Sequence, residues 1–158
     1  PMVGPYLKYM AFVQRRPIAC LSWGGAAWKT ACRDRFIGWS SRTRSKNLFL
    51  IVNNTRFLIL PWVKVPHLAS HLLSQNIKGL PSDWYHWYRY APVLLETFVD
   101  GERFSGTSYK AANWLWVGKT QGRGKNDRDH QMTLSVKDVF LYPLKKDFRE
   151  ILNHEYRG

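Results

Sequence analysis

The chain has 158 residues, the length of one domain, and a formal net charge of +13, with 24 Lys and Arg against 11 Asp and Glu. A content of 45% hydrophobic residues excludes a disordered chain, and two cysteines, Cys20 and Cys32, are too few for a disulfide scaffold or a cysteine-rich zinc site. No run approaches the ~18 apolar residues of a membrane helix, and no signal-peptide pattern opens the sequence. We therefore expect a single domain over residues 1–158, with no membrane partner, in the reducing cytoplasm.

The predicted elements follow from hydrophobic periodicity and turn residues. In chain order they are two strands over 6–23 with a tight turn at 15–17, an irregular basic segment at 24–39, a helix from 40 to about 52, a strand at 55–63, a helix at 65–77, a helical or loop piece at 80–90, a strand at 92–100, a short helix at 106–114, a strand at 114–120, a loop at 121–130, a strand at 136–144 and a helix at 145–155. The run 47–52 could equally be a strand. Alternating strands and helices favour a mixed α/β fold.

The positive charge is unevenly distributed along the chain. Residues 1–79 contain 12 Lys and Arg and a single acid, Asp34, whereas residues 80–158 contain 12 Lys and Arg and 10 acids. Such a field attracts polyanions and steers their approach. We therefore expect a nucleic acid, DNA foremost, as the partner. A merely soluble basic protein, or one bound to a ribosome or an anionic membrane, is the alternative.

Basic residues interleaved with aromatic ones predict a nucleic-acid-binding groove, because cations bind phosphates while rings stack on unpaired bases. The candidates are Lys29, Arg33, Arg35, Arg42, Arg44 and Lys46, with Trp28, Phe36 and Trp39 between them. The run "TQGRGKNDR" adds Arg123, Lys125 and Arg128 between glycines, where backbone amides could bind a phosphate. A solvated helix face, and an ordinary Gly-rich hairpin loop, would show the same patterns.

Glu96 is the one charge in the apolar run "VLLETFV" of a predicted buried strand. A carboxylate there needs a partner, and Arg56 on the other central strand is the one we expect. The pair could simply hold two strands together, or Glu96 could line a cleft as a general base. His67 and His71 stand four apart, as zinc ligands can, but no third ligand is evident, so no metal site is predicted and the cofactor is left open.

Residues 104–117, "FSGTSYKAANWLWV", resemble the last helix and strand of the GNAT acyltransferase fold, with Tyr109, Asn113 and Trp114 at its Tyr, small-residue and aromatic positions. The resemblance implies a mixed, mostly antiparallel central sheet flanked by helices, with Tyr109 as general acid or oxyanion donor and Asn113 orienting a substrate. The alternative for Tyr109 is an aromatic whose hydroxyl bonds to the backbone. The pyrophosphate-binding turn of that fold would fall on Lys64, His67 and Ala69, where His67 replaces its first Gly.

A second resemblance covers essentially the whole chain. The stretches "RDRFIGWS", "NNTRFLILPWVKVPHLASHLL", "LLETFVDGERFSGTSYKAANW" and "VGKTQGRGKNDR" are similar to the protein A family of the Druantia anti-phage system. Its members also accompany transposable elements and carry a further N-terminal region, which implies that this chain is part of a longer protein. The family implies work on DNA in defence or mobile elements.

The leading expectation is a DNA-binding protein with Glu96 and Tyr109 inside one cleft and Arg123 to Arg128 at its rim, able to modify or process DNA. A non-enzymatic adaptor that recognises DNA for a helicase or transposase is the second. An acyl-CoA-dependent N-acyltransferase is the third.

Overall fold

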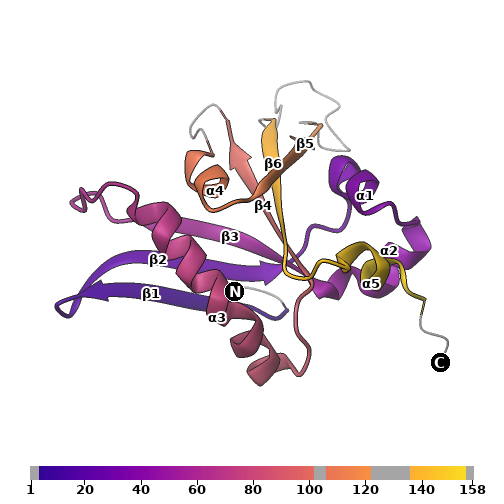
Figure 1. Ribbon diagram of the computed structural model, residues 1–158, viewed down its shortest axis with the longest axis horizontal. Coiled ribbons are helices and arrows are strands. Elements are labelled where there is room, and N and C mark those ends of the chain that lie inside the picture. Colours follow the sequence, from indigo (N-terminus) through magenta and orange to yellow (C-terminus); the bar gives the residue numbers. More distant parts are fainter. Residues whose placement is uncertain (1–3, 102–105, 122–135, 156–158) are drawn as a thin grey trace, which may run out of the picture.

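A six-stranded sheet forms the centre of the molecule, in a computed structural model that describes residues 4–101, 106–121 and 136–155. The strand order is β1-β2-β3-β4-β6-β5, and every neighbouring pair is antiparallel except β3 with β4 (Figure 1). The strands are β1 (Leu7–Val13), β2 (Arg16–Gly25), β3 (Ile51–Ile59), β4 (Leu94–Asp100), β5 (Leu115–Lys119) and β6 (Lys137–Pro143). The expected mixed, mostly antiparallel sheet with flanking helices is confirmed.

The strands β3 and β4 separate soon after they begin. They are in register at Ile51 with Leu94, Val52 with Leu95 and Asn53 with Glu96, and are not paired with each other beyond that point. Figure 1 shows the result, a V with β1, β2 and β3 in one arm and β4, β6 and β5 in the other. The V therefore opens a gap inside the sheet between two strand edges.

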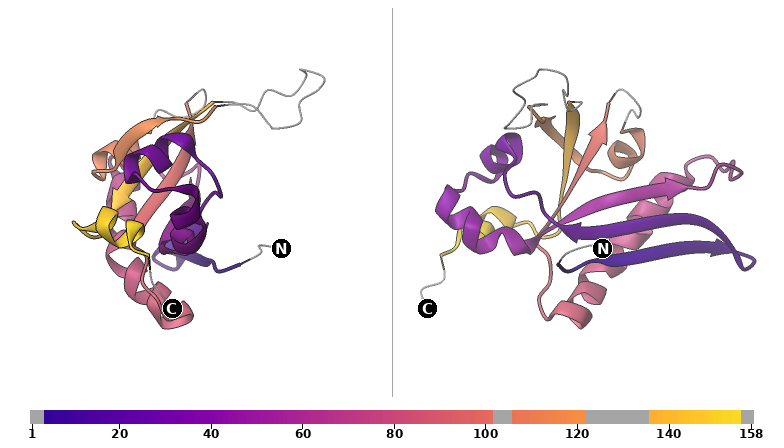
Figure 2. Two further views of the ribbon diagram at one scale, coloured as in Figure 1. Left: turned by 90° about the vertical axis from the view of Figure 1, so that its right-hand side faces the viewer. Right: turned by 180° about the vertical axis from the view of Figure 1, so that it is seen from behind.

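Helices cover both faces of the sheet (Figures 1 and 2). On what we call the α3 face lie α3 (Leu68–Tyr88) and α4 (Thr107–Ala111), packed on sheet residues that include Val52 and Leu95. On the α1 face lie α1 (Ala31–Ile37), α2 (Ser41–Asn47), the 3-10 turn η1 (Leu48–Leu50) and α5 (Phe148–Asn153), packed on Ile51 and Leu94. Successive residues of a strand point to opposite faces, so neighbouring apolar residues enter two separate cores.

Three elements differ from their predicted bounds. The segment expected to be irregular contains α1, and the helix expected to reach residue 52 ends in η1, because Ile51 and Val52 are buried in the sheet as the start of β3. The pieces at 65–77 and 80–90 form the single helix α3, with Pro81 inside it. Burial of one stripe of residues on both sides of Pro81, ending at Trp84, favours the continuous helix despite the lost backbone hydrogen bond.

The face of the β1–β3 arm opposite α3 is defined by its register. Directly paired residues share a face, so Lys8, Ser22 and Arg56 form one cross-strand row on the side away from α3. Tyr9, Leu21 and Phe57, one position along, pack in the core beneath α3. Within the described ranges, no helix is long and apolar enough to span a bilayer.

Candidate functional site

The gap between β3 and β4 is a cavity of about 560 Å³. Its lining comes from β3, the start of α3, the far end of β4, α4 and the first residue of β6: Asn54, Thr55, Arg56, Phe57, Ile59, Ala69, Thr97, Phe98, Val99, Asp100, Gly106, Thr107, Ser108, Tyr109 and Lys137. Hydroxyl groups, three aromatic side chains and three charged side chains thus surround a space large enough for a small ligand.

Tyr109 is held at the wall of this cavity by a side chain of β3. Its hydroxyl donates to Asn54 Oδ1 at 2.6 Å, and Asn54 Nδ2 donates in turn to the carbonyls of Ser22 at 3.0 Å and Arg56 at 3.2 Å. Burial raises the pKa of the Tyr109 hydroxyl above its ordinary value, while a hydrogen bond with Thr97 lowers it by less. The phenol therefore stays protonated at neutral pH, with its proton donated to Asn54.

A glycine fixes the position of α4, and with it that of Tyr109. Gly106, the residue before α4, has φ +70°, and a Cβ built on it would lie 2.8 Å from Phe140 Cζ on β6. The Tyr109 ring stacks on the same Phe140 ring with centroids 6.0 Å apart. Only a residue without a side chain allows the helix to approach the sheet this closely.

Glu96 lies on the opposite face of the sheet from Tyr109. Its side chain has no solvent exposure and accepts hydrogen bonds from Arg33 Nη1 at 2.7 Å, Asn53 Nδ2 at 2.7 Å and Ala27 N at 3.0 Å. The expected pairing with Arg56 is therefore wrong, because Arg56 belongs to the cavity and Arg33 of α1 takes its place. The expectation that Glu96 and Tyr109 share one cleft is also wrong, since β4 turns Glu96 toward α1 and its neighbour Thr97 toward the cavity.

Asp34 extends this buried network beneath α1 and α2. Its carboxylate accepts from Arg33 at 3.0 Å, Arg44 at 3.1 Å and Trp39 Nε1 at 2.8 Å. Arg33, Arg44 and Trp39 are all buried. The structure thus contradicts their predicted place on a nucleic-acid-binding surface, because each is buried and donates to Asp34 or Glu96 inside the protein.

The other predicted cations of this region are exposed. Lys29, Arg35, Arg42 and Lys46 reach solvent along the loop before α1, α1 itself and α2, and Trp28 beside them is 61% exposed with the Arg44 guanidinium 5.4 Å from its ring centroid. Their role as phosphate ligands stays a prediction. Arg123, Lys125 and Arg128 lie outside the described residues.

Asn113 does not line the cavity. It is an exposed residue between α4 and β5 with φ +69°, a left-handed conformation that Asn tolerates better than most residues, and its backbone N–H donates to the Lys110 carbonyl at 3.1 Å. We therefore see it forming the turn into β5. Sequence reasoning missed Asn54, although two consecutive Asn residues inside an apolar strand were a signal that polar groups meet there.

The turn before α3 keeps an unusual backbone. His67, the N-terminal cap of α3, is exposed and has φ +61°, a conformation that favours glycine. Ala69, two residues later, lines the cavity. Within the described ranges, no three His, Cys, Asp or Glu side chains gather as a metal site would require.

Three comparisons with known proteins bear on this geometry. The family model described as "Druantia protein DruA" matches residues 1–133. Comparison with curated protein sequences finds no match.

Solved structures of similar shape are GNAT acetyltransferases. A GNAT-family acetyltransferase from Streptococcus pneumoniae has a TM-score of 0.54 and 11% identity, over 89% of this chain and 67% of that one. The aminoglycoside acetyltransferase AAC(6')-Ib in complex with coenzyme A has a TM-score of 0.56 and 10% identity, over 92% of this chain and 69% of that one. The microcin C7 self-immunity acetyltransferase MccE, in complex with acetyl-CoA and AMP, has a TM-score of 0.53 and 7% identity, over 88% of this chain and 61% of that one. The likeness shows the fold.

Proposed function

The chain belongs to the Druantia protein DruA family, and from that premise we propose that it is a DNA-binding protein of anti-phage defence. Its primary role in this proposal is recognition of DNA on behalf of a partner enzyme such as a helicase or transposase. The proposal assigns no chemical step to Glu96, because that carboxylate is enclosed and its hydrogen bonds are made by Arg33, Asn53 and Ala27.

One observation carries the proposal. Ten of the twelve Lys and Arg in residues 1–79 are exposed, and the two buried ones, Arg33 and Arg44, pair with Asp34 and Glu96. Asp34 is the single acid of that half of the sequence. The internal network is therefore neutral, and the exposed cations face solvent without an acid from their own half to offset them, as phosphate binding requires.

The test is DNA binding by two variants of equal charge. K29Q/R42Q/K46Q removes three exposed cations of residues 1–79 on the α1 side, and R89Q/K110Q/K119Q removes three exposed cations of residues 80–158, at the end of α3, on α4 and on β5. We expect the first to weaken the binding of a labelled duplex by roughly tenfold or more at physiological salt, since each lost phosphate contact lowers affinity. The second should change it less than about twofold. Equal losses in both variants would contradict the placement, and no binding by the unaltered protein would contradict the function.

Acyl transfer is a second candidate, favoured by the cavity at the divergence of β3 and β4 with the protonated Tyr109 at its wall. To protonate a leaving thiolate, the Tyr109 hydroxyl would first turn away from Asn54 Oδ1, to which it donates. Calorimetric titration with coenzyme A tests this candidate directly, and it fails if the titration gives no binding heat at millimolar ligand.

A further inference from the structure

We propose that the cavity between β3 and β4 receives a single nucleotide of the bound DNA, turned out of the base stack. This inference rests on the DNA binding proposed above and deepens it. It gives the cavity a ligand class, whereas the exposed cations alone would make the protein a binder of phosphates.

The size of the cavity sets the first condition. At about 560 Å³ it lies within the range of roughly 300–1,000 Å³ typical of small-ligand sites, and it is far too narrow for a duplex about 20 Å across. A nucleotide enters such a space when it is single-stranded or extruded from a helix.

Open backbone edges supply the second condition. Past Asn53 and Glu96 the strands are no longer paired in the sheet, and the Thr97 hydroxyl donates to the Asn54 carbonyl at 3.0 Å where the gap begins. Further along, the facing edges of β3 and β4 can exchange hydrogen bonds with a ligand between them. The hydroxyls of Thr55, Thr97 and Ser108 line the same space. A nucleobase edge carries both donors and acceptors, which is the pattern that two open strand edges complement.

Two aromatic rings in the cavity lining meet the third condition for binding a nucleotide. Phe57 and Tyr109 meet edge to face with ring centroids 6.4 Å apart, and both line the cavity. Packing of a base against such rings offsets part of the cost of removing it from its stack.

Positive charge at the cavity meets the fourth condition for binding a nucleotide. Arg56 and Lys137 line the cavity and are exposed, and Asp100, the acid of the lining, lies directly opposite Lys137 in register. Arg56 is an exposed cation of the lining, so a phosphate chain leaving the cavity meets it there.

A solved structure with a similar fold was determined in complex with coenzyme A, so an acyl carrier is the competing ligand. At the start of α3, however, His67 carries a side chain at a glycine-like φ of +61°. A Cβ and an imidazole at this turn keep backbone amides from closing on a pyrophosphate. A nucleotide between the strands needs no such turn.

The experiment compares two labelled duplexes that differ by one central mismatch, titrated into the protein at fixed salt. A mismatched base costs less to extrude, so we expect the mismatched duplex to bind about tenfold tighter. The variant Arg56→Gln should abolish this preference, and Ala69→Trp, which fills the cavity from a half-buried position in the first turn of α3, should do the same. The matched control Lys8→Gln removes a cation of the same cross-strand row outside the cavity lining and should keep the preference.

Each outcome has one meaning. If the protein binds both duplexes equally, or if Lys8→Gln loses the preference as fully as Arg56→Gln, the inference is overturned while DNA binding stands. If neither duplex binds, the proposed function itself fails. Binding of coenzyme A that Ala69→Trp removes, with no preference for the mismatch, would assign the cavity to an acyl carrier.

Discussion

A carboxylate and a guanidinium without solvent exposure meet at the base of the V, where Glu96 of β4 accepts from Arg33 of α1 at 2.7 Å. Asn53 and the Ala27 amide complete the shell around the carboxylate. Burying two charges is costly unless each is paired and hydrogen-bonded, and here both conditions are met. The network joins β4, β3, the loop before α1 and α1 itself, so its role is to hold the α1 layer on the sheet.

Neutralising this carboxylate should cost stability. Glu96→Gln leaves the Arg33 charge buried with Asp34 as its remaining partner, and we expect the free energy of unfolding to fall by about 3 kcal/mol. Urea denaturation measures the change. The matched control is Glu150→Gln, at an exposed position of α5, which should stay within about 0.5 kcal/mol of the parent protein. A folded Glu96→Gln protein as stable as the control would refute the structural role.

The sequence identified Glu96 as a residue that needs a partner, and this was right in physical terms. It could not identify Arg33, because the partner lies 63 positions away on a helix that the pattern did not predict. Nor could it separate Glu96 from Tyr109. The alternation of side chains along β4 predicts that Glu96 and Thr97 point to opposite faces of the sheet. Which helices cover each face depends on the packing of the whole sheet.

The elements themselves were largely predictable, because a strong hydrophobic periodicity in the sequence distinguishes a strand from a helix. β4 and β6 were found within two residues of their ends, and the order of strands and helices was correct apart from α1. That short helix has no apolar stripe of its own to signal it, since Arg33 is one of its buried residues. A buried arginine looks like an exposed one in the sequence, so the hydrophobic pattern does not reveal the helix.

The start of α3 carries a strained residue whose replacement should help the fold. His67 has φ +61°, which costs a residue with a Cβ about 1–2 kcal/mol. His67→Gly should raise the free energy of unfolding by about 0.5–1 kcal/mol after the greater freedom of glycine in the unfolded chain is counted. Ala69→Gly, inside the helix, should lower it by about 1 kcal/mol. Thermal or urea unfolding of both variants measures this, and a loss of stability in both would show that the His67 side chain makes a contact that outweighs the strain.

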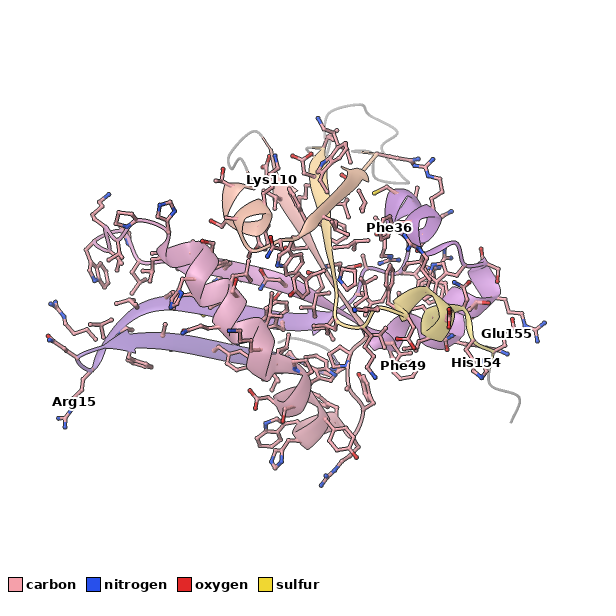
Figure 3. All side chains as sticks on the ribbon, viewed as in Figure 1. Arg15, Phe36, Phe49, Lys110, His154 and Glu155 are labelled. Carbon is pink, nitrogen blue, oxygen red and sulfur yellow. The ribbon has the colours of Figure 1, made fainter. Side chains whose placement is uncertain are left out.

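On the scale of the whole molecule, the cations of residues 1–79 fall into two groups, those paired with acids inside the protein and those exposed at its surface. Buried cations are matched with buried acids, and the remaining cations of residues 1–79 are exposed. Figure 3 shows Arg15 at the tip of the β1–β2 hairpin and Lys110 on α4, well apart on the molecule. A protein with this charge releases counterions when it binds a polyanion, so its binding constant falls as the salt concentration rises.

The salt dependence of DNA affinity is therefore the most direct test of the proposed DNA binding. The affinity of the protein for labelled single-stranded and duplex DNA should be measured over a series of salt concentrations. We expect tight binding at low salt and a plot of log affinity against log salt with a slope steeper than about −3, corresponding to four or more phosphates contacted at about 0.9 counterions each. Absence of binding at low salt, or binding whose strength does not change with salt, would contradict the account and would leave the exposed cations as a surface for an acidic protein.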